Sequence, residues 1–551
     1  MSTQPTLPTI SSLGTDNIVI QSWCERNGYS YLPGEHGDIR ISAVQSAEAR
    51  FTYIAETSTV SDEIYELAIQ GEPPHCEVQI TFAGERGLRY ALNAIGRMLK
   101  RSEWQEGVHF DYPRFPIRGI IEGFYGQPWS QEQRLEMLRF IATHNMNTYV
   151  YGPKDDVYHR ERWQDLYDEE SYARLRSAFA ETTALGLDFY YSIAPGLSMR
   201  YSSESEFAAL VRKVDQIHNL GITDFCLLLD DIPEELQHQE DQAAYGDLVE
   251  AHVRLVNRFY AEIMKWNADI RLIVCPTQYW GKGNERYISQ LGSRMHPSIE
   301  MFWTGRNICA PEITLSEAAV FTQSTHRKPL YWDNYPVNDV EMTDEMHIGP
   351  YRQRDRHLYR FSRGVIANGM EYAESSKIAY ATIADYLWNP EKYDPEASWR
   401  DALEEIVGQA DLADMLTFAD NVRYSCLYLT DSPMLGAELT KFNFAYFYGD
   451  REQAIDNLEQ LFARMIESGA RLLSGMENKK LQGELQRWLY KYAAGCALMQ
   501  ECVQYIRSQN PDDLERIRLN YELYRKDLTY VFADVLMSFM NKVLDHYFTI
   551  Q

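Results

Sequence analysis

GITDFCLLLDDIPEELQ, residues 221–237, joins an apolar run to two adjacent acids. The run from Phe225 to Leu229 predicts a strand, and it stops at Asp230 and Asp231. Adjacent carboxylates repel each other, so the pair requires an explanation. A helix cap, a metal site and a pair of catalytic acids with different roles all fit this stretch alone.

Eight runs of this kind lie between residues 117 and 369, and amphipathic helical stretches separate them. They are IRGII (117–121), TYVYG (148–152), DFYYSIAPG (188–196), DFCLLLD (224–230), RLIVCP (271–276), IEMFWTG (299–305), PLYWDN (329–334) and GVIANG (364–369). Strands and helices that alternate in this number predict an α/β fold, a (β/α)8 TIM barrel. A doubly wound sheet is the alternative, but no glycine-rich phosphate loop follows any run.

The segments on either side of the expected barrel (113–395) have different patterns. Residues 1–112 predict an α+β domain, with short alternating runs and a stretch of helical spacing at 86–101. The runs are NIVIQSW (17–23), ARFTYIAE (49–56), EIYELAIQ (63–70) and CEVQITFAG (76–84). Residues 396–551 predict an all-helical domain, whose apolar faces indicate internal packing or, alternatively, a dimer or peptide-binding surface.

The composition is typical of a globular chain that avoids polyanions. Hydrophobic residues make up 45% of the 551, and a chain of this length implies several domains. The net charge of −27 predicts repulsion from nucleic acids and anionic membranes. The eight cysteines show no CxxC and no ordered spacing, so we expect buried thiols rather than disulfides or a zinc site.

The sequence shows no targeting or membrane signal. It begins MSTQPTLPTISSLGTDN, which lacks the basic and then apolar regions typical of a signal peptide. No apolar run reaches the length of about 18 residues that a membrane span needs. We therefore expect a cytoplasmic protein.

Acids, amides, lysine or aromatic side chains follow seven of the eight runs. They are Glu122, Gly123 and Tyr125; Lys154, Asp155 and Asp156; Asp230 and Asp231; Tyr279 and Trp280; Trp303 and Thr304; Trp332, Asp333, Asn334, Asn338 and Asp339; and Asn368. The carboxyl ends of the strands form the active site of such barrels. Sugars need polar partners for their hydroxyls and flat apolar surfaces for their C–H faces, so these residues favour a carbohydrate site.

A divalent metal is the rival explanation for the acids. Histidine is scarce near the strand ends, and neither HxH nor HExxH occurs, so zinc is not expected. Magnesium would be held by Asp155, Asp156, Asp230 and Asp231. A helix cap also remains open, because DDIPEE (230–235) resembles a helix start with a proline in its first turn.

Together the strand-end segments resemble glycoside hydrolase family 84, which contains the protein O-GlcNAcases and their bacterial relatives. The segments are RGIIEGFYGQPWS (118–130), YVYGPKDD (149–156), LLLDDI (227–232), CPTQYW (275–280), FWTG (302–305), YWDNYPVND (331–339) and GVIANGMEYAESSKIAYATIADYLWNPEKY (364–393). They occur in the family's order. The family also has an α+β domain before the barrel and a helical domain after it, and the flanks match these in character.

The resemblance implies a retaining β-N-acetylglucosaminidase that works by substrate-assisted catalysis. The 2-acetamido oxygen of the substrate attacks its own anomeric carbon and forms an oxazoline, so no protein nucleophile, metal or cofactor is required. The family's motif places Asp230 at the acetamido group and makes Asp231 the general acid and base. Successive strand residues point opposite ways, so neighbouring carboxylates can reach two different atoms.

The resemblance also assigns sugar-binding positions. Asp339 matches the residue at O4 and O6; Gly123, Lys154 and Asn368 match groups around O3 and O4; and Tyr279, Thr304, Trp332 and Asn334 match the acetamido pocket and its surroundings. Packing at the barrel mouth is the alternative for Thr304 and Trp332. An ion pair with Asp155 or Asp156 is the alternative for Lys154. Glu122 and Asp333 flank these positions as structural partners.

The expected reaction is removal of β-linked GlcNAc from protein serine or threonine, or from related glycosides. The alternatives are the same chemistry on chitin- or hyaluronan-derived fragments, and a glycan-binding protein that has lost catalysis. The intact acid pair argues against the last. The expected partners are these glycosides, with neither nucleic acid nor membrane, and the helical faces leave a homodimer open.

Overall fold

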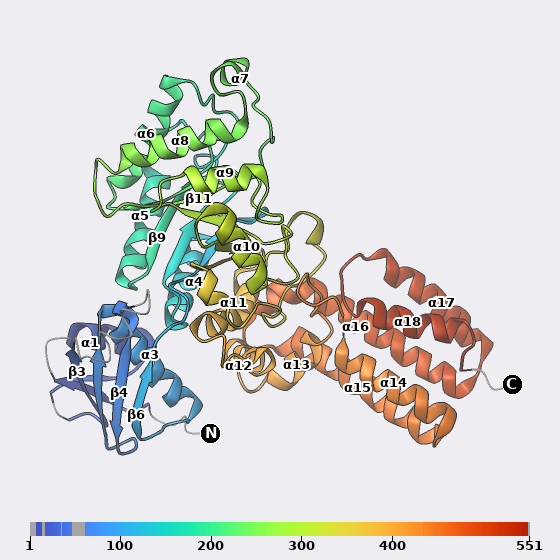
Figure 1. Ribbon diagram of the computed structural model, residues 1–551. Coiled ribbons are helices and arrows are strands. Elements are labelled where there is room, and N and C mark those ends of the chain that lie inside the picture. Colours follow the sequence, from blue (N-terminus) through green and yellow to red (C-terminus); the bar gives the residue numbers. More distant parts are fainter. Residues whose placement is uncertain (1–6, 14–16, 35, 47–60, 431, 549–551) are drawn as a thin grey trace.

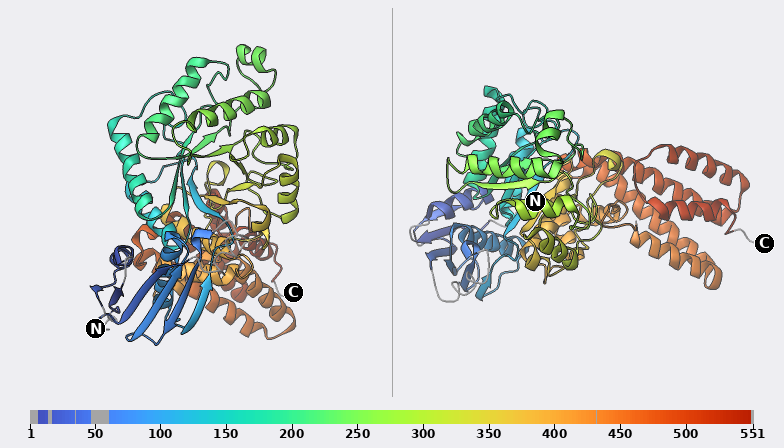
Figure 2. Two further views of the ribbon diagram at one scale, coloured as in Figure 1. Left: turned by 60° about the vertical axis from the view of Figure 1, so that its left-hand side comes forward. Right: turned by 45° about the horizontal axis from the view of Figure 1, so that its top comes forward.

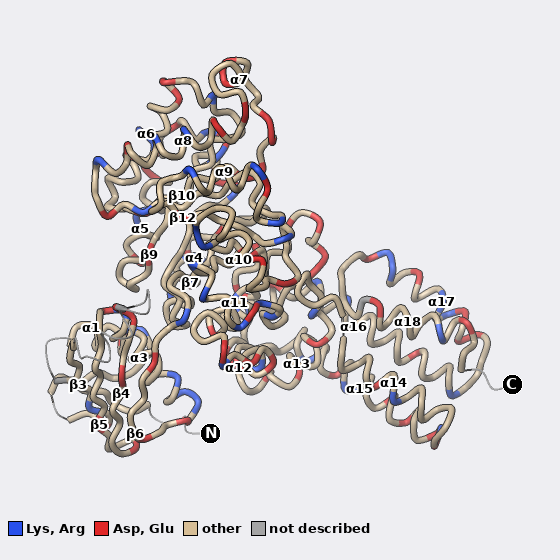
Figure 3. Tube along the Cα trace, viewed as in Figure 1, with Lys and Arg blue, Asp and Glu red and all other residues tan. Residues whose placement is uncertain are grey.

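The computed structural model describes residues 7–13, 17–34, 36–46, 61–430 and 432–548. The chain forms a small sheet with helices, then a closed barrel surrounded by helices, then a helical bundle (Figure 1). The bundle projects from the barrel, away from the N-terminal sheet (Figure 2). Acidic and basic residues are interleaved over all three parts (Figure 3).

The N-terminal part is a six-stranded sheet in the order β2-β1-β3-β5-β4-β6. Its elements are β1 (Ile10–Leu13), α1 (Asn17–Asn27), β2 (Tyr31–Pro33), β3 (Ile39–Gln45), η1 (Ser61–Glu63), β4 (Tyr65–Gln70), β5 (Cys76–Phe82), α3 (Glu85–Arg101) and β6 (Gly107–Asp111). The expected strand at 17–23 is wrong, because Ile20, Trp23 and Cys24 are buried on one face of α1 at helical spacing. The run at 49–56 lies outside the described residues.

Each of the eight barrel runs forms one strand of a closed parallel barrel. The strands are β7 (Ile117–Glu122), β8 (Thr148–Tyr151), β9 (Asp188–Ile193), β10 (Asp224–Leu228), β11 (Arg271–Cys275), β12 (Glu300–Trp303), β13 (Leu330–Asp333) and β14 (Gly364–Asn368). β14 pairs with β7 and closes the sheet. The predicted barrel is confirmed, and the doubly wound alternative is wrong because its sheet would stay open.

The barrel strands are apolar because both of their faces are buried. In β10, Cys226 and Leu228 pack in the barrel interior, whereas Phe225 and Leu227 pack outward among residues of the surrounding helices. This is the arrangement expected of parallel strands covered by helices. The helices are α4 (Gln131–Thr143), α5 (Glu169–Ala184), α6 (Glu204–His218), α7 (Gln239–Tyr245), α8 (Leu248–Ile263), α9 (Arg286–Arg294), α10 (Leu315–Thr325) and α11 (Ala373–Trp388).

The C-terminal part is helical. Its elements are α12 (Pro395–Val407), α13 (Leu412–Ala419), α14 (Pro433–Tyr448), α15 (Arg451–Gly475), α16 (Lys479–Ser508), α17 (Pro511–Lys526) and α18 (Ala533–Leu544). The apolar residues on one face of α15 and one face of α16 are buried in a shared core, as their spacing predicts; they are Ile455, Leu458, Phe462, Met465, Leu481, Leu485, Trp488 and Tyr492. Among the described helices, none has the length and apolar character that crossing a membrane requires.

Candidate active site

A cavity of about 440 Å³ opens at the carboxyl ends of the barrel strands. All ten site residues predicted from the sequence line it: Gly123, Lys154, Asp230, Asp231, Tyr279, Thr304, Trp332, Asn334, Asp339 and Asn368. They lie at or beyond the ends of different strands, so the closed barrel brings together residues that are up to 245 positions apart in sequence, as Gly123 and Asn368 are.

The backbone after β10 makes the two adjacent carboxylates diverge. Leu229 donates its N–H to the Cys275 carbonyl at 2.9 Å, and its own carbonyl accepts from Thr277 Oγ1 at 2.7 Å. Asp231 then takes a φ of 51°, in the left-handed region that costs a non-glycine residue about 1 kcal/mol or more. The Asp230 side chain is 7% exposed and that of Asp231 31%, so the neighbours lie in different environments.

The Asp230 carboxylate is paired at one oxygen only. Lys154 Nζ donates to Oδ2 at 2.8 Å, from a side chain that is 4% exposed. Oδ1 is buried and, among the described residues, has no hydrogen-bond partner. Burial alone would raise the pKa of Asp230, but the Lys154 ammonium outweighs it and holds that pKa below its ordinary value. Asp230 is therefore a buried anion with one acceptor oxygen that no described residue uses.

Two phenols bind the Asp231 carboxylate. Tyr279 donates its hydroxyl to Oδ1 at 3.0 Å, and Tyr125 donates to Oδ2 at 2.9 Å. Arg160 Nη1 donates to the Tyr125 oxygen at 2.8 Å, which leaves the phenol proton for Asp231. The Lys154 ammonium lies 3.5 Å from Asp231 Oδ2. Asp231 thus has several fixed partners while it stays partly open to solvent.

The sequence places Tyr125 among the strand-end residues but assigns it no role, and it does not single out Arg160. Tyr125 lies two residues after Gly123 at a predicted strand end, so its position was a usable signal. Arg160 lies in an irregular segment between β8 and α5, where no periodicity indicates which side chain turns back to the barrel. Ile308 and Cys309 also line the cavity from such a segment, between β12 and α10.

The helix-cap explanation of the acid pair is wrong. The residues that follow Asp231 are irregular, and the next helix, α7, begins at Gln239 after His238. Tertiary hydrogen bonds, such as the one from Tyr279, hold Asp231 at its left-handed φ within this irregular segment. Local propensity for a helix start is overridden by these contacts.

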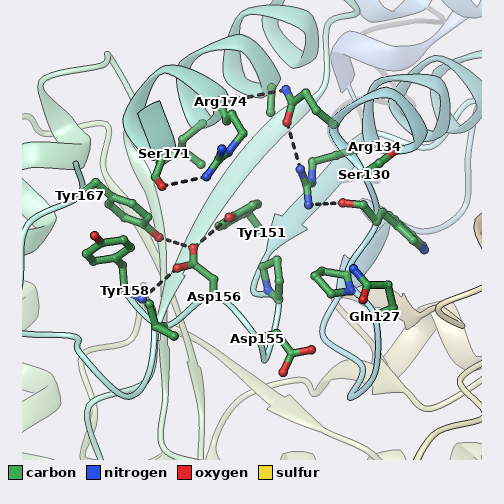
Figure 4. Close-up of a pocket in the computed structure, with 17 residues that line it drawn as sticks. Gln127, Ser130, Arg134, Tyr151, Asp155, Asp156, Tyr158, Tyr167, Ser171 and Arg174 are labelled. Carbon is green, nitrogen blue, oxygen red and sulfur yellow. Dashed lines mark hydrogen bonds between the residues drawn. The ribbon is translucent and has the colours of Figure 1, made fainter. Parts of the chain in front are cut away.

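The four acids considered for magnesium do not share a cavity. Asp155 and Asp156 line a neighbouring cavity of about 400 Å³ beside α4 and α5, drawn in Figure 4, whereas Asp230 and Asp231 line the barrel cavity. Asp156 Oδ2 accepts hydrogen bonds from two tyrosine hydroxyls at 2.6 and 2.9 Å. The four-carboxylate site is therefore wrong, and so is an ion pair of Lys154 with Asp155 or Asp156.

A chain of hydrogen bonds connects the opposite wall of the cavity. Asn334 Oδ1 accepts from Trp332 Nε1 at 2.9 Å and from Asn368 Nδ2 at 3.1 Å. Asn368 Oδ1 in turn accepts from the Gly123 N–H at 3.2 Å. A Cβ on Gly123 would lie 2.8 Å from the Trp332 ring, so the close approach of backbone and indole requires glycine here. Trp332 also packs edge-on against Phe302, with 5.3 Å between ring centroids.

Asp339 and Thr304 are the remaining two of the predicted residues that line the cavity. Asp339 Oδ2 accepts from the Tyr125 N–H at 2.7 Å, and burial raises the pKa of Asp339. Thr304 Oγ1 donates to the Asn307 carbonyl at 2.8 Å, so its hydroxyl serves the local loop. Thr304 is itself buried, which is consistent with the packing role considered for it.

Glu122 and Asp333 are structural partners, as the sequence predicts. Glu122 accepts two hydrogen bonds from Arg134, both at 2.7 Å. Asp333 accepts two from Arg354, at 2.9 and 2.7 Å. All four side chains are buried, and bidentate pairing of this kind fixes the strand ends from which the cavity residues extend.

Comparison with known proteins identifies the family. A family model described as beta-N-acetylglucosaminidase matches residues 118–420. The chain belongs to this β-N-acetylglucosaminidase family. The match spans the barrel strands β8–β14 in full, nearly all of β7, and α12 and α13. It confirms the resemblance that the strand-end segments indicated.

Two kinds of relative support the family assignment. The protein O-GlcNAcases of Rattus norvegicus and Mus musculus are each 31% identical over 274 residues, or 49% of this chain and 29% of theirs. The chain therefore spans well under half the length of these relatives. A mutant of the Thermobaculum terrenum O-GlcNAc hydrolase is 33% identical over 78% of this chain and 95% of its own, with a TM-score of 0.74. CpGH84B is 26% identical over 97% and 96%, with a TM-score of 0.82.

Proposed function

We propose that this member of the family is a retaining exo-β-N-acetylglucosaminidase that works by substrate-assisted catalysis through an oxazoline. The buried, unpaired Oδ1 of Asp230, two bonds from the Lys154-bound Oδ2, carries the proposal. A buried acceptor without a partner costs about 1–3 kcal/mol. The N–H of a 2-acetamido group would satisfy it.

In the first step Asp230 accepts the acetamido N–H and so directs the acetamido oxygen toward the anomeric carbon. The C1–O bond to the acetamido group forms as the glycosidic bond breaks, and positive charge develops beside the Asp230 anion. Asp231, in its protonated form, gives its proton to the leaving oxygen. The divergence of the two side chains lets them serve different atoms.

In the second step the Asp231 carboxylate takes a proton from water, and the water oxygen attacks C1 and opens the oxazoline with retention. Tyr125 and Tyr279 hold Asp231 in place through both steps. Burial would lower the pKa of Lys154, but Asp230 and Asp231 raise it above its ordinary value. Lys154 therefore stays an ammonium and keeps Asp230 anionic throughout.

The proposed substrates are O-GlcNAc groups on protein serine or threonine, or related small β-GlcNAc glycosides. The names of the rat, mouse and Thermobaculum terrenum relatives, which are O-GlcNAcases or an O-GlcNAc hydrolase, support this choice. The same chemistry on chitin- or hyaluronan-derived fragments is the alternative. A rate comparison between an O-GlcNAc peptide and a chitin oligomer distinguishes the two.

The reaction is tested with aryl and alkyl β-N-acetylglucosaminides. Asp230→Asn should lose about 10²–10³-fold in kcat with every leaving group, because each substrate must cyclise. Asp231→Ala should lose about 10²–10⁴-fold with an alkyl leaving group and much less with a nitrophenol, which needs little protonation. Fluorination of the substrate acetamide should slow the wild type progressively, because it weakens the internal nucleophile.

Asp155→Asn is the matched control, since Asp155 lies next to Lys154 in sequence but lines the neighbouring cavity. Near-normal turnover by Asp230→Asn would contradict substrate assistance. Equal losses of Asp231→Ala on both leaving groups would contradict its role as proton donor. A wild type that binds N-acetylglucosamine without hydrolysing any glycoside would instead support a glycan-binding protein.

A further inference from the structure

Helix α16 of the C-terminal part starts at the barrel (Figure 1). It contacts a loop that carries cavity residues and the start of α11, the helix into which a second such loop leads. One loop follows β13, and Asp339 in it directly precedes the 3₁₀ turn η2 (Val340–Met342). The other follows β14 and begins after Asn368. Two adjoining stretches of α16, at Glu484 and at Arg487 with Trp488, make these contacts.

Glu484 caps the helix that follows β14. The N-cap residue of α11, Tyr372, makes no side-chain cap hydrogen bond of its own. The Glu484 carboxylate instead accepts from the N–H of Glu374 at 2.9 Å, the N–H of Ser375 at 2.7 Å and the Ser375 hydroxyl at 2.8 Å. First-turn N–H groups have no partners within their own helix, so an anion at this position satisfies them and matches the helix dipole.

The start of α16 is tied to the start of α11 in return. Asn478 caps α16 by accepting from the Leu481 N–H at 3.0 Å, and its Nδ2 donates to Glu374 Oε1 at 2.8 Å. Lys377 pairs with the other oxygen of Glu374 at 2.5 Å. The two helix starts therefore hold each other by several charge-assisted hydrogen bonds rather than by one.

The start of α11 also fixes the loops after β14 and β7. Ser376 Oγ accepts from the Met370 N–H at 3.0 Å, and the Met370 carbonyl accepts from Trp129 Nε1 at 3.0 Å. Glu371 Oε2 accepts from the Gln127 N–H at 2.9 Å. These bonds join the segment just after Asn368 to the segment just after Tyr125, so a shift of α11 is passed to both.

The loop after β13 is held by the same helix. Trp488 Nε1 donates to the Asp344 carbonyl at 3.1 Å, and Arg487 Nη1 donates to the Thr343 carbonyl at 3.2 Å. The Arg487 guanidinium also pairs with the Asp344 carboxylate. Helix α16 therefore supports the loops on the side of the barrel where Asp339 and Asn368 lie.

We propose that Glu484 is a positioning residue for sugar binding, because its cap on α11 holds Asn368 and the β7 loop in place from the helical part of the chain. The inference rests on the proposed function and on the sugar-hydroxyl contact of Asn368 that the family resemblance implies. In the barrel order β14 lies four strands from β10 in either direction, so it is opposite the acid pair. Loss of the cap should therefore weaken binding more than chemistry.

The test is the separation of KM from kcat on an aryl β-N-acetylglucosaminide. Glu484→Ala should raise KM about tenfold and leave kcat within about threefold, because it removes binding shared by ground state and transition state. A merely structural role would lower the active fraction, so the apparent kcat would fall with KM unchanged. Glu484→Gln keeps one carbonyl acceptor and should have an intermediate KM; it carries the comparison if the alanine variant does not fold.

Lys480→Gln is the matched control on the same helix. The Lys480 ammonium pairs with Glu136 of α4 at 2.6 Å, also between the C-terminal part and the barrel. This pair does not involve the loops after β13 and β14, which carry Asp339 and Asn368. We expect its KM to stay within about twofold of the wild type. An unchanged KM in both Glu484 variants, or an equal rise in Lys480→Gln, would overturn the inference.

The proposed function can fail separately. A wild type without turnover on any β-GlcNAc glycoside would reject the proposed function, whereas an active wild type with unaffected Glu484 variants would reject only the positioning role. In the first case the Kd of N-acetylglucosamine, measured by calorimetry, replaces KM. It should weaken about tenfold in Glu484→Ala, and an unchanged Kd would overturn the inference.

Discussion

Replacing Lys154 with methionine tests whether the stability of the buried Asp230 anion depends on this one cation. The ammonium donates to Asp230 Oδ2 at 2.8 Å and lies 3.5 Å from Asp231 Oδ2. Because Asp230 Oδ1 has no described partner, methionine would leave a buried carboxylate with neither oxygen paired. Removing one member of a buried ion pair costs about 3–5 kcal/mol, and we expect a loss of this size in the free energy of unfolding at neutral pH.

The loss should depend on pH. In the wild type the folded pKa of Asp230 lies below its ordinary value of 3.8, so its ionisation stabilises the fold above that value and is lost as pH falls through the folded pKa. Without Lys154, the largest effect that opposes burial is lost, so we expect the pKa of Asp230 to rise and the variant to gain stability as its carboxyl protonates. The difference between wild type and variant should be largest above about pH 7 and shrink toward about pH 4.

Urea unfolding of the wild type, Lys154→Met, Asp230→Asn and the double variant gives a double-mutant cycle at each pH. We expect a coupling energy of about 2 kcal/mol or more at pH 7, with the double variant more stable than Lys154→Met. Lys282→Met, which removes an exposed lysine after β11, is the control. A coupling below about 0.5 kcal/mol, or a loss that does not shrink with falling pH, would refute the reasoning.

Two further substitutions probe the walls of the cavity. Tyr125→Phe removes the 2.9 Å hydrogen bond to Asp231, so kcat on an alkyl glycoside should fall about tenfold, and an unchanged kcat would contradict the role of this phenol. Gly123→Ala places a Cβ 2.8 Å from the Trp332 ring, so it should raise KM and lower the free energy of unfolding by about 1–3 kcal/mol in urea. Gly483→Ala, whose Cβ meets nothing within 4 Å, is the control. Equal changes of KM and of unfolding free energy in the two variants would contradict the argument.

The barrel was predictable because its strands are buried on both faces and therefore stand out as apolar runs. The N-terminal part was harder to predict from the sequence. In α1, Ile18 is exposed and Ile20 is buried, although the two would share one face of a strand. Trp23 ends the run NIVIQSW and Cys24 lies one residue beyond it, so the helical spacing of Ile20, Trp23 and Cys24 is visible only past the end of the run.

The cavity lining was predictable for a different reason. A closed barrel brings all strand ends to one rim, so position after a strand was enough to find residues such as Lys154 and Asn334. Arg160 lies in an irregular segment, and only folding brings it to Tyr125. Glu484 lies on a distant helix, and only folding brings it to α11. No pattern in the sequence around Arg160 or Glu484 indicates these contacts.

The proposed mechanism requires different protonation behaviour of the two adjacent acids, Asp230 and Asp231. Asp230 must stay anionic next to a developing positive charge, and its burial beside the Lys154 ammonium serves this because the neighbouring cation keeps the carboxylate ionised. Asp231 must give a proton to a leaving group and take one from water, which requires access to the open side of the cavity. A regular strand would bury one side chain and direct its neighbour into the surrounding helices. The left-handed turn at Asp231 avoids this, because it brings the second carboxylate back to the rim, where Tyr125 and Tyr279 receive it.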